Sequence, residues 1–347
     1  MISSVRRSLT SATIIGAGLL LLVWLIARAD PRQIWSALGQ VGWGFVTILA
    51  IAGARFAVRA LAWMQCLEPP HRLRFTEAFT AVLCGDALGN ATPLGPLVSE
   101  PAKVAFVRDR VPMGVAFTAL AIENVFYTLS VAAMIAAGIT ALLLRGGLDR
   151  ELRLAAEIGI ALVLAIYIGA TWVLMRQPAV LTRTLAVVAR IVPALGSPHR
   201  IDKVHRLEQE IYTFAARRRG TAGTIVAAEL IFHALGVLEV FLALWLLRGE
   251  PPSIVTSFIL ETANRLIIVL FKFIPMQQPV VGGAATVLVA RALGLTQETA
   301  LALAIVRGGR MLFWQFAGTV LLVRHGMSTR RILQDRELQS GRAAAGR

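Results

Sequence analysis

The chain has 347 residues, of which 56% are hydrophobic and 16% charged, and it carries a net charge of +15. Soluble domains are about 45–50% apolar and about 25% charged, so the composition excludes an ordinary soluble domain, a disordered chain and a collagen-like chain. The two cysteines, Cys66 and Cys84, provide no disulfide framework and no metal-ligand spacing. An apolar but strongly basic chain is typical of a membrane protein with basic cytoplasmic loops, although nucleic-acid binding produces a similar charge.

Six apolar runs are long enough to cross a bilayer as helices, which takes about 20 residues. The first run is followed by Arg28 and Pro31 and then by another apolar segment, not by a small-residue cleavage site. We therefore expect it to be an uncleaved span and not a signal peptide. The six predicted spans cover residues 11–27, 43–67, 114–144, 154–175, 221–247 and 299–323.

Two further apolar stretches, residues 77–98 and 253–295, are interrupted by glycine and proline. Broken backbone at membrane depth leaves unpaired N–H and C=O groups, which are tolerated only inside protein or beside a water-filled cavity. Both stretches are therefore predicted to be re-entrant helical hairpins. If they cross the membrane instead, the chain has eight spans.

The two broken stretches each begin a similar unit, 77–144 and 253–323. In the first unit Pro93 precedes Glu123 of the following span by 30 residues, and in the second Pro275 precedes Arg307 by 32. Because two spans lie between the units, the second unit enters from the opposite side, as in the inverted repeats of secondary transporters. The predicted fold is an all-α polytopic membrane protein, with a single transmembrane domain over 1–323 and a basic tail over 324–347.

The basic residues gather in segments that an internal N-terminus places in the cytoplasm. Residues 176–220 carry nine basic and three acidic residues, and the tail carries six and two. This distribution predicts a bacterial inner-membrane protein with both termini cytoplasmic. Within 176–220, residues 199–219 form an amphipathic basic helix suited to an anionic membrane surface, although a helix packed on the bundle is the alternative. No aromatic platform accompanies these charges, so we expect no nucleic-acid partner.

Charged and amide side chains recur at helical spacing inside the predicted spans. Each charge at a helix centre costs about 2.5–3.5 kcal/mol if it faces lipid, so these groups are expected to pair, to face the bundle interior or to line a wet cavity. Polar pairs that only hold helices together are the alternative. The candidates for binding a lipid headgroup are Arg55, Arg59, Asn90, Glu100, Lys103, Asn264, Arg265, Arg307 and Arg310. The candidates for charge pairing or proton relay are Asp86, Glu123, Asn124, Glu229, His233, Glu239 and Glu261.

Arginines three or four residues apart suit an anionic headgroup, because a guanidinium matches phosphate in a bidentate manner. Glu229 and His233 are also four residues apart and would suit a metal, but no third ligand follows at helical spacing. We therefore expect no metal and no cofactor. No Walker motif is present, so ATP is not expected to drive the protein directly.

Two proline- and glycine-rich segments resemble the membrane domain of lysylphosphatidylglycerol synthases, also called the flippase-like domain family. The first is 92–103, which ends in Glu100 and Lys103, and the second is 275–283, followed by the span that carries Arg307. The chain has Ser99-Glu100 and Lys103 where the family usually has Gly-Glu and Arg. The resemblance extends from about residue 8 to 324.

The resemblance implies a membrane domain that moves a modified phospholipid between leaflets. In full-length synthases a soluble domain transfers the aminoacyl group; only 24 residues follow Val323 here, so we expect no such activity. The resulting hypothesis is a lipid flippase whose partner is a phospholipid or another polar lipid. The alternatives are a membrane enzyme acting on polyprenyl- or hopanoid-type lipids and an accessory subunit that docks a soluble synthase.

Overall fold

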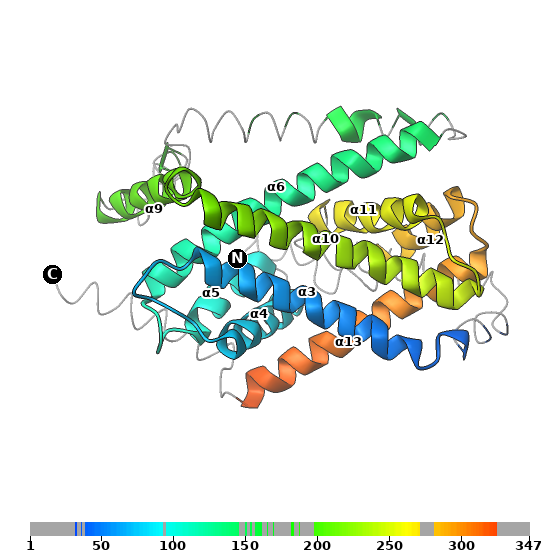
Figure 1. Ribbon diagram of the computed structural model, residues 1–347, viewed down its shortest axis with the longest axis horizontal. Coiled ribbons are helices and arrows are strands. Elements are labelled where there is room, and N and C mark those ends of the chain that lie inside the picture. The colour runs from blue at the N-terminus through cyan, green and yellow to red at the C-terminus, as the bar shows by residue number, and fades with distance from the viewer. Residues whose placement is uncertain are drawn as a thin grey trace, which may run out of the picture.

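The computed structural model describes residues 39–92, 95–145, 198–270 and 281–324, with scattered positions between 32 and 36 and between 150 and 187 (Figure 1). Within these ranges the regular structure is entirely helical. The helices are α3 (Gly44–Cys66), α4 (Phe75–Asn90), α5 (Gly95–Phe106), α6 (Met113–Arg145), α9 (Pro198–Arg217), α10 (Arg219–Arg248), α11 (Ile254–Leu270), α12 (Gly283–Ala292) and α13 (Gln297–Arg324).

Three of these helices, α3, α6 and α10, are long and apolar enough to cross a membrane. The shortest of them has 23 residues, which at 1.5 Å per residue is about 35 Å and exceeds the roughly 30 Å bilayer core. The described part of the chain is therefore all-helical and carries several apolar helices of membrane-spanning length, as the predicted polytopic fold requires. The predicted span 299–323 forms α13, which is one continuous helix but carries Arg307 and Arg310 and is not among the three. The predicted spans 11–27 and 154–175, like the tail, lie outside the continuously described ranges.

The helices form an elongated bundle with two distinct ends. At one end, called the α9 end, Arg218 donates to the carbonyl of Leu67 in the α3–α4 loop at 3.2 Å. At the opposite end, Arg145 at the close of α6 donates to the carbonyl of Leu293 after α12 at 3.4 Å. Helices α3 and α10 run side by side between the ends, with α6 and α13 on opposite sides of them (Figure 1).

Both broken stretches separate into two helices. The first breaks after Asn90 and continues as α5, and the second ends α11 at Leu270 and continues as α12. The pair α4–α5 starts and finishes at the α9 end, where it connects the end of α3 to the start of α6. The pair α11–α12 starts and finishes at the opposite end (Figure 1). Pro93 and 275–279, which carried the prediction, lie outside the described residues.

The interior alternates between apolar and polar layers along the bundle. One apolar cluster lies toward the α9 end and includes Trp63 and Ala116, and another lies toward the opposite end and includes Ile48 and Leu301. The charged residues of α3, Arg55 and Arg59, fall between Ile48 and Trp63 in the sequence of that helix. The buried charges therefore occupy the middle of the molecule, with apolar packing on both sides.

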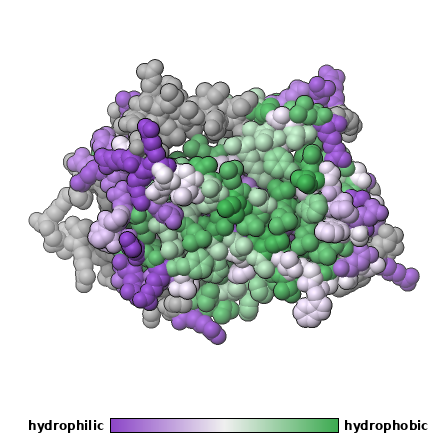
Figure 2. Space-filling view, in the orientation of Figure 1, coloured by the Kyte–Doolittle hydropathy of each residue, from purple (hydrophilic) through white to green (hydrophobic). Residues whose placement is uncertain are grey.

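The outer surface has the opposite arrangement, with apolar residues in the middle and polar residues at the ends. Figure 2 shows hydrophobic residues across the middle of one face and hydrophilic residues at both ends. Large apolar side chains are exposed on this bundle, among them Leu230 and Phe316, which are 64% and 70% exposed. A band of this kind is what a helix bundle presents to lipid.

The predicted amphipathic helix is present as α9. Its Phe214 is buried and packs edge to face with Phe126 of α6, at 6.3 Å between ring centroids, while Asp202 and Arg206 are exposed. Part of the apolar side of α9 therefore packs on the bundle. Contact between its basic side and an anionic membrane remains a prediction.

Candidate functional site: two charge clusters around a membrane cavity

Five buried side chains and the partly exposed Arg310 form one charge network between α3, α10, α11 and α13, here called the arginine cluster. Glu261 is its centre: Oε1 accepts from Arg265 Nε and Nη2 at 2.9 and 2.7 Å and from Arg55 Nη2 at 3.4 Å. The other oxygen, Oε2, accepts from Arg307 Nη2 at 2.6 Å. The cluster comprises Arg55, Glu239, Glu261, Arg265, Arg307 and Arg310.

The second carboxylate of this cluster joins two further helices. Glu239 Oε2 of α10 accepts from Arg55 of α3 and from Arg310 of α13, both at 3.1 Å. The cluster thus holds four arginines against two glutamates, which leaves a formal charge of +2. Arg307 is 5% exposed, and its Nε and Nη1 have no hydrogen-bond partner among the described residues. This surplus of buried positive charge favours an anionic ligand.

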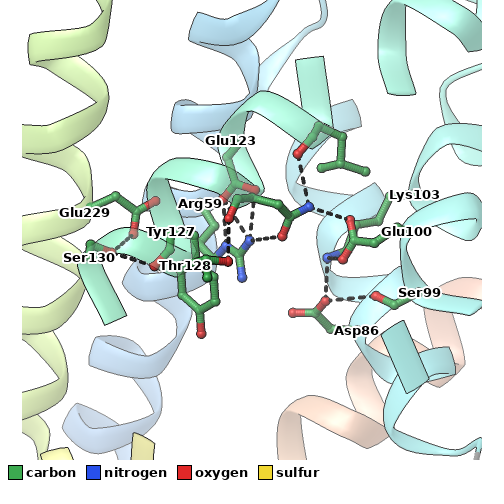
Figure 3. Close-up of polar contacts among 12 residues, drawn as sticks. Arg59, Asp86, Ser99, Glu100, Lys103, Glu123, Tyr127, Thr128, Ser130 and Glu229 are labelled. Atoms are coloured by element: carbon green, nitrogen blue, oxygen red, sulfur yellow. Dashed lines mark hydrogen bonds and ion pairs between the residues drawn. The ribbon is translucent and has the colours of Figure 1, made fainter. Parts of the chain in front are cut away.

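A second network, the lysine cluster, connects α3, α4, α5 and α6 (Figure 3). Arg59 Nε and Nη2 donate to the two oxygens of Glu123, each at 2.9 Å. At the other end, Lys103 Nζ lies 2.7 Å from Asp86 Oδ1 and 3.2 Å from Glu100 Oε1.

Asn124 links the two halves of the lysine cluster. Its side-chain nitrogen donates to Glu100 Oε2 at 3.0 Å, and its oxygen accepts from Arg59 Nη2 at 3.4 Å. The cluster comprises Arg59, Asp86, Glu100, Lys103, Glu123 and Asn124, with two bases against three acids and so a formal charge of −1. The two clusters therefore differ in the sign of their charge.

A cavity of about 200 Å³ lies between the two clusters. Four arginines and one aspartate line it, so its charged lining is predominantly positive. The polar lining residues are Arg55, Arg59, Asp86, Asn90, Tyr127, Asn264, Arg265, Arg310 and Gln315. The rest of the lining is apolar or aromatic: Ala52, Phe56, Leu83, Ala87, Phe232, Ile268, Met311 and Trp314.

Aromatic rings hold the cavity arginines in place. Arg55 and Arg265 both stack on Phe232, with Cζ at 4.7 and 4.9 Å from the ring centroid. Arg59 stacks on Tyr127 at 4.0 Å. Cation–π contacts of this kind strengthen when the cation is removed from water, so the rings orient the guanidinium groups without neutralising them.

A third polar group lies between α6 and α10. Ser130 Oγ is 3.2 Å from Glu229 Oε2 and 2.9 Å from His233 Nε2. The described residues contain no cluster of three histidine, cysteine or acidic side chains that could hold a metal ion.

All sixteen predicted site residues lie in described helices, and the structure sorts them into distinct places. Twelve form the two charge clusters in equal numbers, whereas Glu229 and His233 belong to the third group. Asn90 and Asn264 line the cavity. Only seven of the sixteen line the cavity: Arg55, Arg59, Asp86, Asn90, Asn264, Arg265 and Arg310.

Several contributors were missed at the sequence level. Phe232 and Trp314 were not singled out because aromatic residues are common in spans. Gln315 was overlooked although it follows Arg310 by five residues; its side chain donates to the carbonyl of Ala87 at 2.6 Å. Ser130 looked like an ordinary small residue of α6. Only its packing against α10 reveals its partners, Glu229 and His233.

The chain matches the family described as lysylphosphatidylglycerol synthase TM region over residues 9–318. It belongs to this family. The match confirms the resemblance read from the sequence, and no soluble synthase domain is found alongside it. No curated protein and no solved structure gives a significant match. The lysylphosphatidylglycerol synthase TM region family is linked to lipid modification and lipid flipping.

Proposed function

We propose that this chain binds a polar lipid headgroup in the arginine-lined cavity and moves the lipid between the leaflets of the bacterial inner membrane. The observation that carries the proposal is the cavity itself, in which four arginines face one aspartate within apolar and aromatic walls. A wholly structural set of ion pairs would not need an open space with a positive lining. The family's link to lipid flipping agrees with this reading.

The size and chemistry of the cavity suit a phosphate-bearing headgroup. A volume of about 200 Å³ holds roughly seven water molecules at about 30 Å³ each, enough for a headgroup and too little for acyl chains. Guanidinium groups bind phosphate through paired N–H donors. Arg310, with a side chain 14% exposed, is the most accessible arginine of its cluster and the first that an entering headgroup would meet.

The two broken helix pairs support alternating access to such a site. Helix α4 of the first pair approaches the cavity from the α9 end and α11 of the second pair approaches from the opposite end, and both contribute lining residues. Two hairpins from opposite sides are the arrangement expected of an inverted repeat, in which movement of one unit against the other exposes the site to either leaflet.

The basic residues orient the protein in the membrane. The α9 end carries Arg72, Arg110, Arg206 and Arg219 on exposed positions, whereas the described opposite end carries fewer basic residues. By the positive-inside rule, the α9 end faces the cytoplasm.

The direct test is transport of a fluorescent phospholipid in vesicles that contain the purified protein. Replacement Arg310→Gln removes a cavity charge while preserving most of the side-chain volume. We expect transport to slow by about tenfold to a hundredfold, because a charge-assisted hydrogen bond contributes about 1.5–3 kcal/mol. The matched control is Arg324→Gln, at an exposed position of the same helix. Wild-type transport by a folded Arg310→Gln protein would exclude this headgroup site.

A further inference from the structure

Glu229 differs from the other acidic side chains of the membrane helices. Asp86, Glu123, Glu239 and Glu261 each lie within 3.1 Å of a lysine or arginine nitrogen. Glu229 is only 2% exposed, yet within the part of the chain that the structure describes no basic side chain lies within ion-pair distance of it. A carboxylate removed from water without a cation is costly, whereas a protonated carboxyl is not.

The hydrogen bonds around Ser130 also call for an additional proton. Its hydroxyl oxygen lies 2.8 Å from the carbonyl of Tyr127 and 3.2 Å from Glu229 Oε2, and both are acceptors when Glu229 is ionised. One hydroxyl hydrogen serves only one of them. If Glu229 is protonated, it donates to Ser130, and Ser130 donates to Tyr127. Both contacts are then satisfied.

His233 supplies a second proton acceptor in the same group. Its Nε2 lies 2.9 Å from Ser130 Oγ, while its buried Nδ1 has no partner in the described structure. With the hydrogen assigned to Nε2, a proton can bind at Nδ1, the Nε2 hydrogen can pass to Ser130, and the Ser130 hydrogen can pass to Glu229. An N–H bond forms at His233 Nδ1 and one breaks at Nε2, Ser130 exchanges one O–H bond for another, and an O–H bond forms at Glu229. The bound proton thus neutralises Glu229 without any other reactant.

The group lies directly behind the wall of the cavity. Tyr127 and Phe232 line the cavity, and their rings meet edge to face at 5.7 Å between centroids. Phe232 also packs against His233 at 5.4 Å. A proton bound here is thus separated from the headgroup site by one layer of aromatic side chains.

The neighbouring charges make the protonation state of this group relevant to the headgroup site. Arg55 and Arg59 of α3 and Glu123 of α6 act electrostatically on Glu229 or His233. On α10 and α11, Glu239 and Arg265 are held in the arginine cluster. When Glu229 is ionised, it offsets part of the positive charge of Arg59; when it is protonated, that charge is available to an anionic headgroup.

We propose that Glu229, Ser130 and His233 form a proton-binding site whose occupancy is coupled to headgroup movement. This inference rests on the proposed lipid transport, but proton binding can be measured separately. The proton comes from water and returns to water, and no covalent bond to lipid is formed.

The first measurement is infrared difference spectroscopy between acid and alkaline pH, on the protein in vesicles of phosphatidylethanolamine and phosphatidylglycerol. We expect a protonated-carboxyl band that Glu229→Gln removes and that Ser130→Ala shifts. The matched control is Glu68→Gln, at an exposed carboxyl outside the spans, which should leave this band unchanged. A band that persists in folded Glu229→Gln protein would overturn the proton-binding site.

The second measurement is lipid transport in the same vesicles under an imposed pH gradient. We expect the wild-type rate to change by up to about tenfold per pH unit, because one unit changes the ratio of protonated to ionised sites tenfold, and the Glu229→Gln rate to be insensitive to the gradient. Wild-type transport that ignores the gradient would overturn the coupling. If the wild-type protein moves no lipid at all, the proposed transport fails, while the infrared band still decides whether the proton site exists.

Discussion

At the scale of single residues, the central feature is that one carboxylate serves three guanidinium groups. Glu261 contacts Arg55, Arg265 and Arg307, and it is only 1% exposed. Removing one partner from a buried ion pair leaves an uncompensated charge, which is far more costly than loss of a surface pair. The cluster therefore depends on Glu261 more than on any single arginine.

We expect Glu261→Gln to destabilise the protein by about 3–5 kcal/mol, because the amide cannot neutralise the arginines that remain buried. Thermal unfolding of the detergent-solubilised protein measures this change. The matched control is Glu157→Gln, which breaks the exposed Arg153–Glu157 pair and should cost less than about 1 kcal/mol. Similar losses from both substitutions would show that the arginine cluster is not a buried, interdependent network.

The sequence predicted which charged residues belong to the site better than it predicted which of them form ion pairs with one another. Spacing on one helix identified Glu261 with Arg265, which are four apart and do form an ion pair. It placed Arg55 and Arg59 on one face, and both line the cavity. It did not connect Arg307 with Glu261, 46 residues earlier, because partners on different helices depend on tertiary packing.

At the scale of helices, α10 reaches the arginine cluster through a glycine. A Cβ on Gly236 would lie 2.7 Å from Glu261 Oε1 and 3.3 Å from Arg55 Cζ. The absence of a side chain at this position lets the backbone of α10 lie against the ion pair. The same helix carries Gly223, where a Cβ would have open space within 4 Å.

We expect Gly236→Ala to cost about 1–3 kcal/mol through overpacking, and to displace Glu261 or Arg55. Gly223→Ala should instead be neutral or stabilise α10 by up to about 1 kcal/mol, because alanine has the higher helix propensity. Thermal unfolding and lipid transport of the two variants can be compared directly. Equal stability of both variants would contradict the close approach of α10 to the cluster.

The helices themselves were largely predictable. Runs of apolar residues located α3, α6, α10 and α13 to within a few residues, and the three- and four-residue spacing of apolar side chains located α9. Glycine and proline identified the break between α4 and α5. The close packing of these two helices was not predictable, since it depends on Gly89, where a Cβ would lie 2.8 Å from Ser99 Cβ.

At the scale of the whole molecule, the orientation of the bundle in the membrane can be tested by labelling its two ends. With the α9 end cytoplasmic, a cysteine introduced as Asp202→Cys should react with a membrane-impermeant maleimide only after the inner membrane is opened. Glu250→Cys, at the opposite end, should react in spheroplasts with an intact membrane. Both positions are exposed, and the native Cys66 and Cys84 are buried at 2% and 1% exposure, so they add little background. The reverse labelling pattern would invert the topology.

The opposite charges of the two clusters have an electrical consequence. Arg55 and Arg59 are four residues apart on α3, about 6 Å along its axis, and they belong to the positive and the negative cluster respectively. With the negative cluster nearer the cytoplasm, the built-in field and a cell's inside-negative voltage push an anion in the same direction, outward. Moving one elementary charge across the full membrane against 100 mV costs about 2.3 kcal/mol. We therefore expect membrane voltage to change the transport rate of an anionic lipid more than that of a neutral lipid.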